Sequence, residues 1–127
     1  MELQQQVVNL ELSKRMKDLG FKQESLFWWQ PLNYGDPYLA SGLRDRRFDS
    51  SISSYTVAEL GELLPVEISK AQSKHQYYLE IVKEEEGKWY IRYRNTVDSF
   101  MNLGFEAETE ADARAKMLCY LKENNLL

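Results

Sequence analysis

The side chains that could do chemistry are few, and they do not form a familiar catalytic set. Nucleophilic catalysis of the serine or cysteine type needs an imidazole beside the nucleophile and an acid that orients it. The chain has one histidine, His75, and one cysteine, Cys119. His75 starts a predicted strand, and Cys119 lies inside a predicted helix near its carboxyl end, where a thiolate is not stabilised. We therefore predict no catalytic residue and a packing role for Cys119.

Metal and nucleotide chemistry have little support either. The sequence contains no HExxH, CxxC, EF-hand, Walker A or GxGxxG motif. Carboxylates alone can bind Mg²⁺, and two acidic pairs have suitable spacing, Asp45 with Asp49 and Glu106 with Glu108. Acids on one strand face are more often a solvated surface or ion-pair partners. The prediction is no metal and no cofactor, with a small Mg²⁺-dependent hydrolase as the last-ranked alternative.

The most specific surface pattern alternates aromatic and basic residues on one sheet face. The predicted strands 76–82 and 88–94 place on it Tyr78, Lys88, Tyr90, Arg92 and Arg94. In complexes with single-stranded nucleic acid, bases stack on such aromatics and phosphates pair with such arginines. A second basic cluster could assist, formed by Arg44, Arg46 and Arg47. The alternative is that acids of adjacent strands neutralise the strand arginines, namely Glu80, Glu106 and Glu108.

A run of large aromatics gives a second candidate surface. Trp28 and Trp29 are consecutive in a predicted strand, so their side chains point to opposite faces. Either that strand is covered on both faces or one ring is exposed. An exposed ring beside Tyr34 and Tyr38 would favour a protein–protein contact, whereas the alternative is that the rings belong to the core.

Composition limits the classes of protein to be considered. The 127 residues are 43% hydrophobic and 13% aromatic, which suits one folded domain spanning 1–127. Sixteen basic and twenty acidic residues give a net charge of −4, which argues against a dedicated duplex-DNA binder. No apolar run reaches the roughly 20 residues of a membrane span. The amino-terminal residues lack a secretory pattern and a lone cysteine is typical of a reducing compartment, so we expect a cytoplasmic protein.

Periodicity and capping signals predict the elements that position these residues. Helices are expected over about 8–19, from Thr56 to Leu64, and over 110–124. Strands are expected at 26–30, 76–82, 88–94 and 103–108. Residues 38–48 could hold a further strand, 49–54 resemble a polar loop, and 66–74 are ambiguous.

The predicted fold is α+β. The last three strands form an antiparallel β-meander, and helices pack on one of its faces to give a two-layer sandwich. The covered face is expected to carry Trp89, Ile91, Tyr93 and Phe105.

Three stretches share a pattern with known sequences. They are residues 11–29 (ELSKRMKDLGFKQESLFWW), 55–65 (YTVAELGELLP) and 110–124 (EADARAKMLCYLKEN), about a third of the chain. Together they resemble small hypothetical proteins encoded in bacterial prophages and mobile elements. This resemblance implies a bacterial or phage cytoplasmic origin, but no activity and no catalytic residue. The matched positions are mostly helix caps and apolar stripes, so they concern the fold.

These observations predict a non-enzymatic binding or accessory protein that acts through protein partners or self-association. Its predicted contact residues are Trp28, Trp29, Tyr34 and Tyr38. The first alternative is binding of single-stranded nucleic acid on the open sheet face. The state of Arg92 and Arg94 discriminates between these hypotheses, because acids that neutralise both arginines would remove the basis for nucleic-acid binding.

Overall fold

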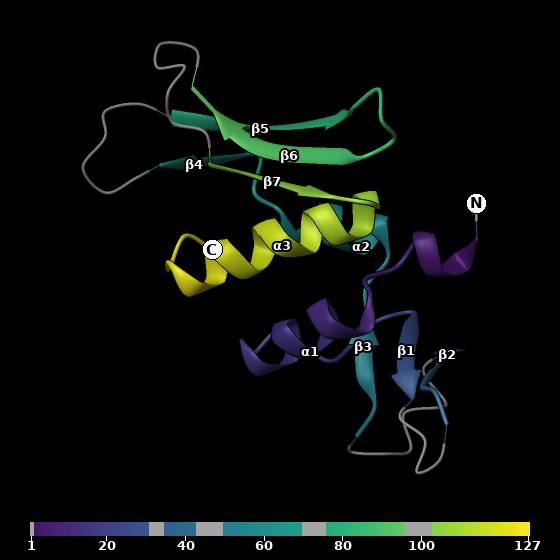
Figure 1. Cartoon of the computed structure of the whole chain (residues 1–127). Helices are drawn as coiled ribbons and strands as arrows, with labels where there is room; N and C mark the ends of the chain where they lie inside the picture. The colour runs from purple at the N-terminus through teal and green to yellow at the C-terminus, as the bar shows by residue number, and fades with distance from the viewer. Residues whose placement is uncertain (1, 31–34, 43–49, 70–75, 96–102) are drawn as a thin grey trace.

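The computed structural model describes residues 2–30, 35–42, 50–69, 76–95 and 103–127, drawn in colour in Figure 1. Its helices are the 3-10 helix η1 (Leu3–Gln5) and the α-helices α1 (Leu10–Asp18), α2 (Val57–Leu63) and α3 (Glu110–Glu123). Its strands are β1 (Phe27–Gln30), β2 (Tyr38–Ser41), β3 (Ile52–Ser54), β4 (Glu67–Ser69), β5 (Gln76–Lys83), β6 (Trp89–Arg94) and β7 (Leu103–Ala107). The predicted α+β class is confirmed. None of these helices is long and apolar enough to cross a membrane.

The main sheet is the predicted meander with one additional strand. Its order is β4-β5-β6-β7, and every neighbouring pair is antiparallel. The β5–β6 hairpin closes through Gly87, whose φ of +85° is a left-handed conformation that suits glycine. On edge strand β7, the Lys116 ammonium donates to the carbonyl of Glu106 at 2.8 Å. Lys116 belongs to α3, and its bond occupies a carbonyl on this edge that could otherwise pair with another chain.

Helix α3 covers one face of the main sheet, as the alternation in the strands predicts (Figure 1). Ile91 and Tyr93 of β6 are fully buried beneath it, and Phe105 of β7 packs against Tyr120 with ring centres 5.7 Å apart. Leu118 contributes a fully buried side chain from α3. Burial of one such side chain stabilises the fold by about 1.5–3 kcal/mol. The other face of the sheet has no helix on it within the described residues.

The helix termini follow the local signals. At the end of α1, Gly20 has φ +89°, and the N–H groups of Gly20 and Phe21 donate to the carbonyls of Lys17 and Met16. This pair of bonds is a Schellman motif. At the start of α2, Thr56 and Glu59 exchange the two hydrogen bonds of the predicted capping box.

The small sheet, of order β2-β1-β3, differs from expectation. Residues 49–54 were expected to form a polar loop, but Ile52–Ser54 forms β3 and pairs with β1. The prediction was wrong because two serine hydroxyls of this segment find partners outside it. Ser54 Oγ donates to the carbonyl of Val8 at 2.6 Å, and Ser51 Oγ donates to Gln30 Oε1 at 2.6 Å. Satisfied hydroxyls can be buried at little cost.

Helices α1 and α3 join the two halves of the molecule. In Figure 1 the main sheet is at the top, α2 and α3 lie beneath it, and α1 and the small sheet lie below α3. The amino ends of α1 and α3 meet where Asp112 accepts from the N–H and the side-chain amide of Asn9. Their carboxyl ends meet where Arg15 donates to Glu123 at 2.7 Å. The two helices therefore run parallel, held at both ends.

Candidate binding surfaces

The face of the main sheet opposite α3 is the first candidate surface. We call it the open face and define it by Tyr78, Glu80, Val82, Tyr90, Arg92 and Arg94. The register places Glu80 opposite Arg92 and Val82 opposite Tyr90. Tyr78 is 47% exposed and Val82 40% exposed. The structure thus brings together four of the five residues predicted for this face, Tyr78, Tyr90, Arg92 and Arg94. The fifth, Lys88, precedes β6.

Glu80 neutralises part of the charge on the open face. Its carboxylate accepts from Arg92 at 2.6 Å and from Arg94 at 3.4 Å. The hydrogen bond from Arg92 is the main reason why the pKa of Glu80 lies below its usual value. Both arginines are therefore engaged by a neighbouring acid.

The other predicted acids have a different role. Glu106 lies opposite Tyr90, not opposite an arginine, and pairs with Lys88 at 3.1 Å. Hydrogen bonding to Glu106, helped by the nearby charge of Glu108, raises the pKa of Lys88. The expectation that Glu106 and Glu108 neutralise the arginines was wrong, because the register places Gly104 across from Arg92.

The Tyr90 ring lies over Gly104, two residues along β7 from its direct partner. A Cβ atom added to Gly104 would stand 2.5 Å from Tyr90 Cζ, so the ring fills the space above the glycine. Arg92 lies over the same ring, with its guanidinium carbon 5.9 Å from the ring centre. Glycine, tyrosine, arginine and glutamate thus form one ordered array across three strands.

The aromatic run of β1 is mostly interior. Trp28 is 1% exposed, so it offers no contact surface, and the prediction for this ring was wrong. Trp29 is half-buried, and its indole N–H donates to the carbonyl of Val8 at 3.0 Å. Tyr38 on β2 is 49% exposed and stays available as a contact residue. The strand is thus largely covered on both faces, one of the two arrangements that its sequence allowed.

Several predicted residues lie outside the described part of the chain. They are Tyr34, Arg44, Asp45, Arg46, Arg47, Asp49 and His75. The described residues hold no group of three or more His, Cys, Asp or Glu side chains that could bind a metal ion. Glu106, one of the acids considered for Mg²⁺, forms an ion pair with Lys88.

Cys119 is fully buried in α3, as its position in the helix predicts. Burial raises the pKa of the thiol to about 11, and the positive charge of Arg15 offsets this only in part. A thiol of this kind is protonated at neutral pH and is a poor nucleophile.

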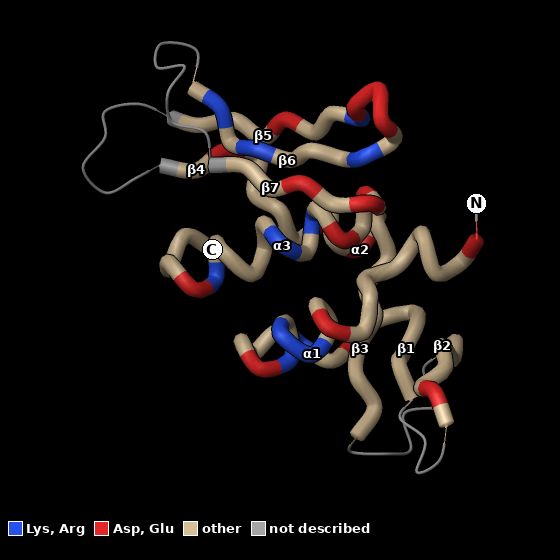
Figure 2. The backbone as a smooth tube through the Cα atoms, viewed as in Figure 1, with Lys and Arg blue, Asp and Glu red and all other residues tan. Residues whose placement is uncertain are grey.

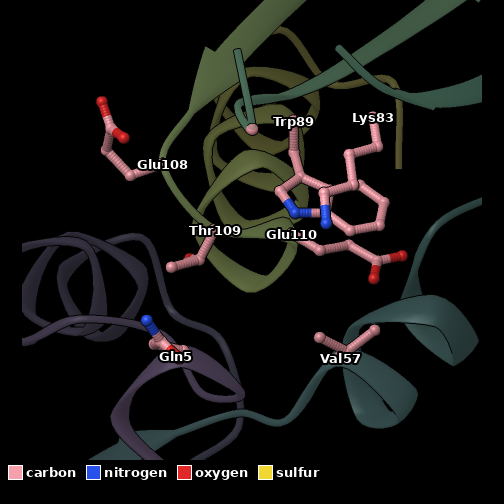
Figure 3. Close-up of a pocket in the computed structure, with 8 residues that line it drawn as sticks. Gln5, Val57, Lys83, Trp89, Glu108, Thr109 and Glu110 are labelled. Atoms are coloured by element: carbon pink, nitrogen blue, oxygen red, sulfur yellow. The ribbon is translucent and has the colours of Figure 1, made fainter. Parts of the chain in front are cut away.

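A second surface, missed in the sequence, is a groove at the hairpin end of the main sheet. Its smaller hollow has a volume of about 220 Å³ (Figure 3). Six of the side chains that line it are Gln5, Val57, Lys83, Trp89, Glu108 and Glu110. Figure 3 shows Trp89 and Lys83 side by side above Glu110, with Gln5 and Val57 on the opposite wall. Four separate segments meet here, and none of them is distinctive alone.

A larger hollow of about 470 Å³ continues the groove, because Val57 and Glu110 line both hollows. Leu3 and Phe27 supply its apolar lining. Leu26, which precedes Phe27, is 58% exposed. We call the two hollows together the hairpin-end groove.

The end of the molecule that holds this groove is acidic. Figure 2 shows acidic residues gathered on the β5–β6 turn and where β7 leads into α3. Those that line the smaller hollow or stand on the adjacent β5–β6 turn are Glu84, Glu85, Glu86, Glu108 and Glu110. The bases beside them are Lys83 and Arg114, so five acids against two bases leave a net charge of −3.

No protein-family model, curated protein or solved structure matches this chain. Function therefore has to be inferred from the geometry of the open face and of the hairpin-end groove. At the start of α2 and of α3, beside the groove, a threonine side chain already accepts from one backbone N–H, so that N–H is not available to bind an anion. Thr56 Oγ1 accepts from the N–H of Glu59, and Thr109 Oγ1 accepts from the N–H of Asp112.

Proposed function

We propose that the chain is a non-catalytic binding protein that docks on a partner protein through its open face. The observation that supports this most is the bridge from Glu80 to both Arg92 and Arg94. It makes the open face a nearly charge-balanced surface of tyrosine, valine and arginine. Such a composition suits a protein partner better than a polyanion.

Nucleic acid is disfavoured by the same bridge. Phosphates bind tightly where several unpaired cations replace released counterions. A phosphate at this site would first have to separate Arg92 from Glu80, which accepts from it at only 2.6 Å. The two arginines minus one glutamate leave a single net positive charge on the open face.

The residue types on the open face are those that dominate the energetics of protein interfaces. Tyrosine and arginine are enriched among residues whose truncation costs at least about 2 kcal/mol of binding. Tyr90 is fixed over Gly104, and Arg92 is held by both the ring and Glu80. Side chains that are ordered before binding lose less entropy in the complex, so more of the contact energy appears as affinity.

A binding comparison tests this proposal. The chain, immobilised by a terminal tag, captures proteins from lysates of lysogenic bacteria, the source that the sequence resemblance suggests. A captured protein is then purified and titrated by calorimetry. The test variant is Tyr78→Ala/Arg94→Ala, because these side chains are exposed and lie outside the core. We expect affinity at least about tenfold weaker.

The matched control is Tyr38→Ala/Lys14→Ala, which removes one exposed tyrosine and one exposed cation elsewhere on the surface. It should bind like the wild type. Equal binding by the test variant, or a loss confined to the control variant, would contradict docking through the open face. Micromolar binding of a single-stranded oligonucleotide that depends on Arg94 would instead restore the nucleic-acid alternative.

A further inference from the structure

We propose that the hairpin-end groove binds an extended basic segment of a partner protein. A lysine or arginine side chain of that segment enters the smaller hollow, and a neighbouring apolar side chain enters the larger one. This proposal is independent of the open face, because it depends on Trp89, Glu108, Glu110 and the apolar side chains of the larger hollow.

Two carboxylates in the smaller hollow have unused capacity for a cation. Glu108 accepts no hydrogen bond from any described residue. In Glu110, Oε1 accepts both bonds from Arg114, at 2.8 and 3.2 Å, and Oε2 accepts none from the described part of the chain. The ammonium or guanidinium group of a bound peptide can donate to these oxygens in a charge-assisted hydrogen bond.

The Trp89 ring is a second feature that favours a cation. Lys83 Nζ lies 5.7 Å from its ring centre, so the face of this indole already holds a positive charge. Lys83 is exposed and can swing into solvent when another cation takes its place. An aromatic face next to carboxylate oxygens that can accept further hydrogen bonds favours the binding of a basic side chain.

The larger hollow explains why the occupant is a peptide and not a small cation. Leu3 and Phe27 line it, and Leu3 is 42% exposed at its edge. The N–H of Leu26 donates to Glu59 Oε2 at 3.3 Å, which keeps this exposed leucine beside the first turn of α2. An apolar side chain of the ligand would gain about 25 cal/mol for each Å² buried here.

Charge complementarity decides the sign of the partner. The net charge of −3 around the smaller hollow attracts a basic segment and repels an acidic one. A second copy of this chain is disfavoured as the occupant, because the same acidic end would have to approach an overall negative molecule with a net charge of −4.

Indole resonances provide a direct test. The ¹⁵N-labelled full chain is titrated with a capped octapeptide that has a leucine-lysine-leucine-arginine core between glycine and serine residues. Its counterpart replaces both basic residues with glutamate. The Trp89 indole signal is assigned by its loss in Trp89→Phe. We expect a saturable shift of this signal with the basic peptide and none with the acidic one.

Three variants sharpen the test. Glu108→Gln should weaken binding about two- to fivefold, as expected for loss of one exposed ion pair. Lys83→Ala should strengthen it, because the competing cation is gone. Asp18→Asn removes the same unit of charge at the far end of α1 and should bind like the wild type, as should Tyr78→Ala/Arg94→Ala.

Any of three results would overturn the proposal. The first is the absence of a Trp89 shift with the basic peptide. The second is an equal loss of affinity in Glu108→Gln and Asp18→Asn, which would mean non-specific attraction. The third is a Trp89 shift that depends on protein concentration without peptide, which would make a second copy of the chain the occupant.

Discussion

Replacing Gly104 with alanine should destabilise the protein, because the Tyr90 ring occupies the space that the methyl group needs. The added Cβ would stand 2.5 Å from Tyr90 Cζ and closer still to the hydroxyl. The ring must move, which costs about 1–3 kcal/mol for an overpacked contact. Alanine returns about 0.4–1 kcal/mol by restricting the unfolded chain. The difference between these two effects is a fall in the free energy of unfolding of up to about 2.6 kcal/mol.

A double-mutant cycle isolates this contact. Urea unfolding, followed by circular dichroism, gives the free energy of unfolding of Gly104→Ala alone and combined with Tyr90→Ala. Without the ring, Gly104→Ala should be neutral or stabilising by up to about 1 kcal/mol. The control background is Tyr78→Ala, which removes a ring from β5, two strands away from Gly104. In this background Gly104→Ala should lower the free energy of unfolding by the same amount as in the wild type. An equal cost with and without Tyr90 would refute the ring-on-glycine contact.

Three further predictions concern charge, reactivity and packing. The hydrogen bond from Arg92 lowers the pKa of Glu80 below its ordinary value of 4.5. The ionised carboxylate therefore stabilises the fold at pH values above about 4.5, and this stabilisation is lost as the pH falls and Glu80 becomes protonated. Urea unfolding at about pH 7 and about pH 3 should therefore show the stability difference between wild type and Glu80→Gln shrinking with acid. Cys119 should resist a chromogenic thiol reagent in the folded protein and react as urea unfolds it; reaction at the same rate without urea would contradict its burial. Leu118→Ala, at a buried site, should lower the free energy of unfolding by about 2–5 kcal/mol. Leu26→Ala, at an exposed site, should change it by under about 0.5 kcal/mol. Equal losses for the two variants in urea titrations would contradict the burial pattern.

The elements that could be predicted are those whose signals are local. The Thr56–Glu59 capping box and the Gly20 terminus lie within a few residues of the bonds that they form, so the sequence alone indicates them. The β5–β6 hairpin has a similar local cause in Gly87 and strict alternation. Strand β3 could not be predicted, because Ser51 and Ser54 are satisfied by groups from distant parts of the chain.

The candidate surfaces divide in the same way. The open face was predictable because its members alternate along two strands of one hairpin. Which acid meets which arginine depends on the register of a third strand, and there the sequence favoured Glu106 and Glu108 as well as Glu80. The hairpin-end groove was missed because Gln5, Val57, Trp89 and Glu110 come from four segments that meet only after the helices pack.

The parallel pair α1 and α3 has a consequence for biosynthesis. The bonds from Asn9 to Asp112 join residues 103 positions apart, and Arg15 to Glu123 spans 108 positions. On the ribosome, the buried side of α1, with Leu12 and Met16, emerges long before α3 is available to shield it. Closing so long a loop is entropically costly and slows folding. During synthesis of the 103 positions that separate Asn9 from Asp112, the nascent chain thus presents an apolar stripe that chaperones can recognise.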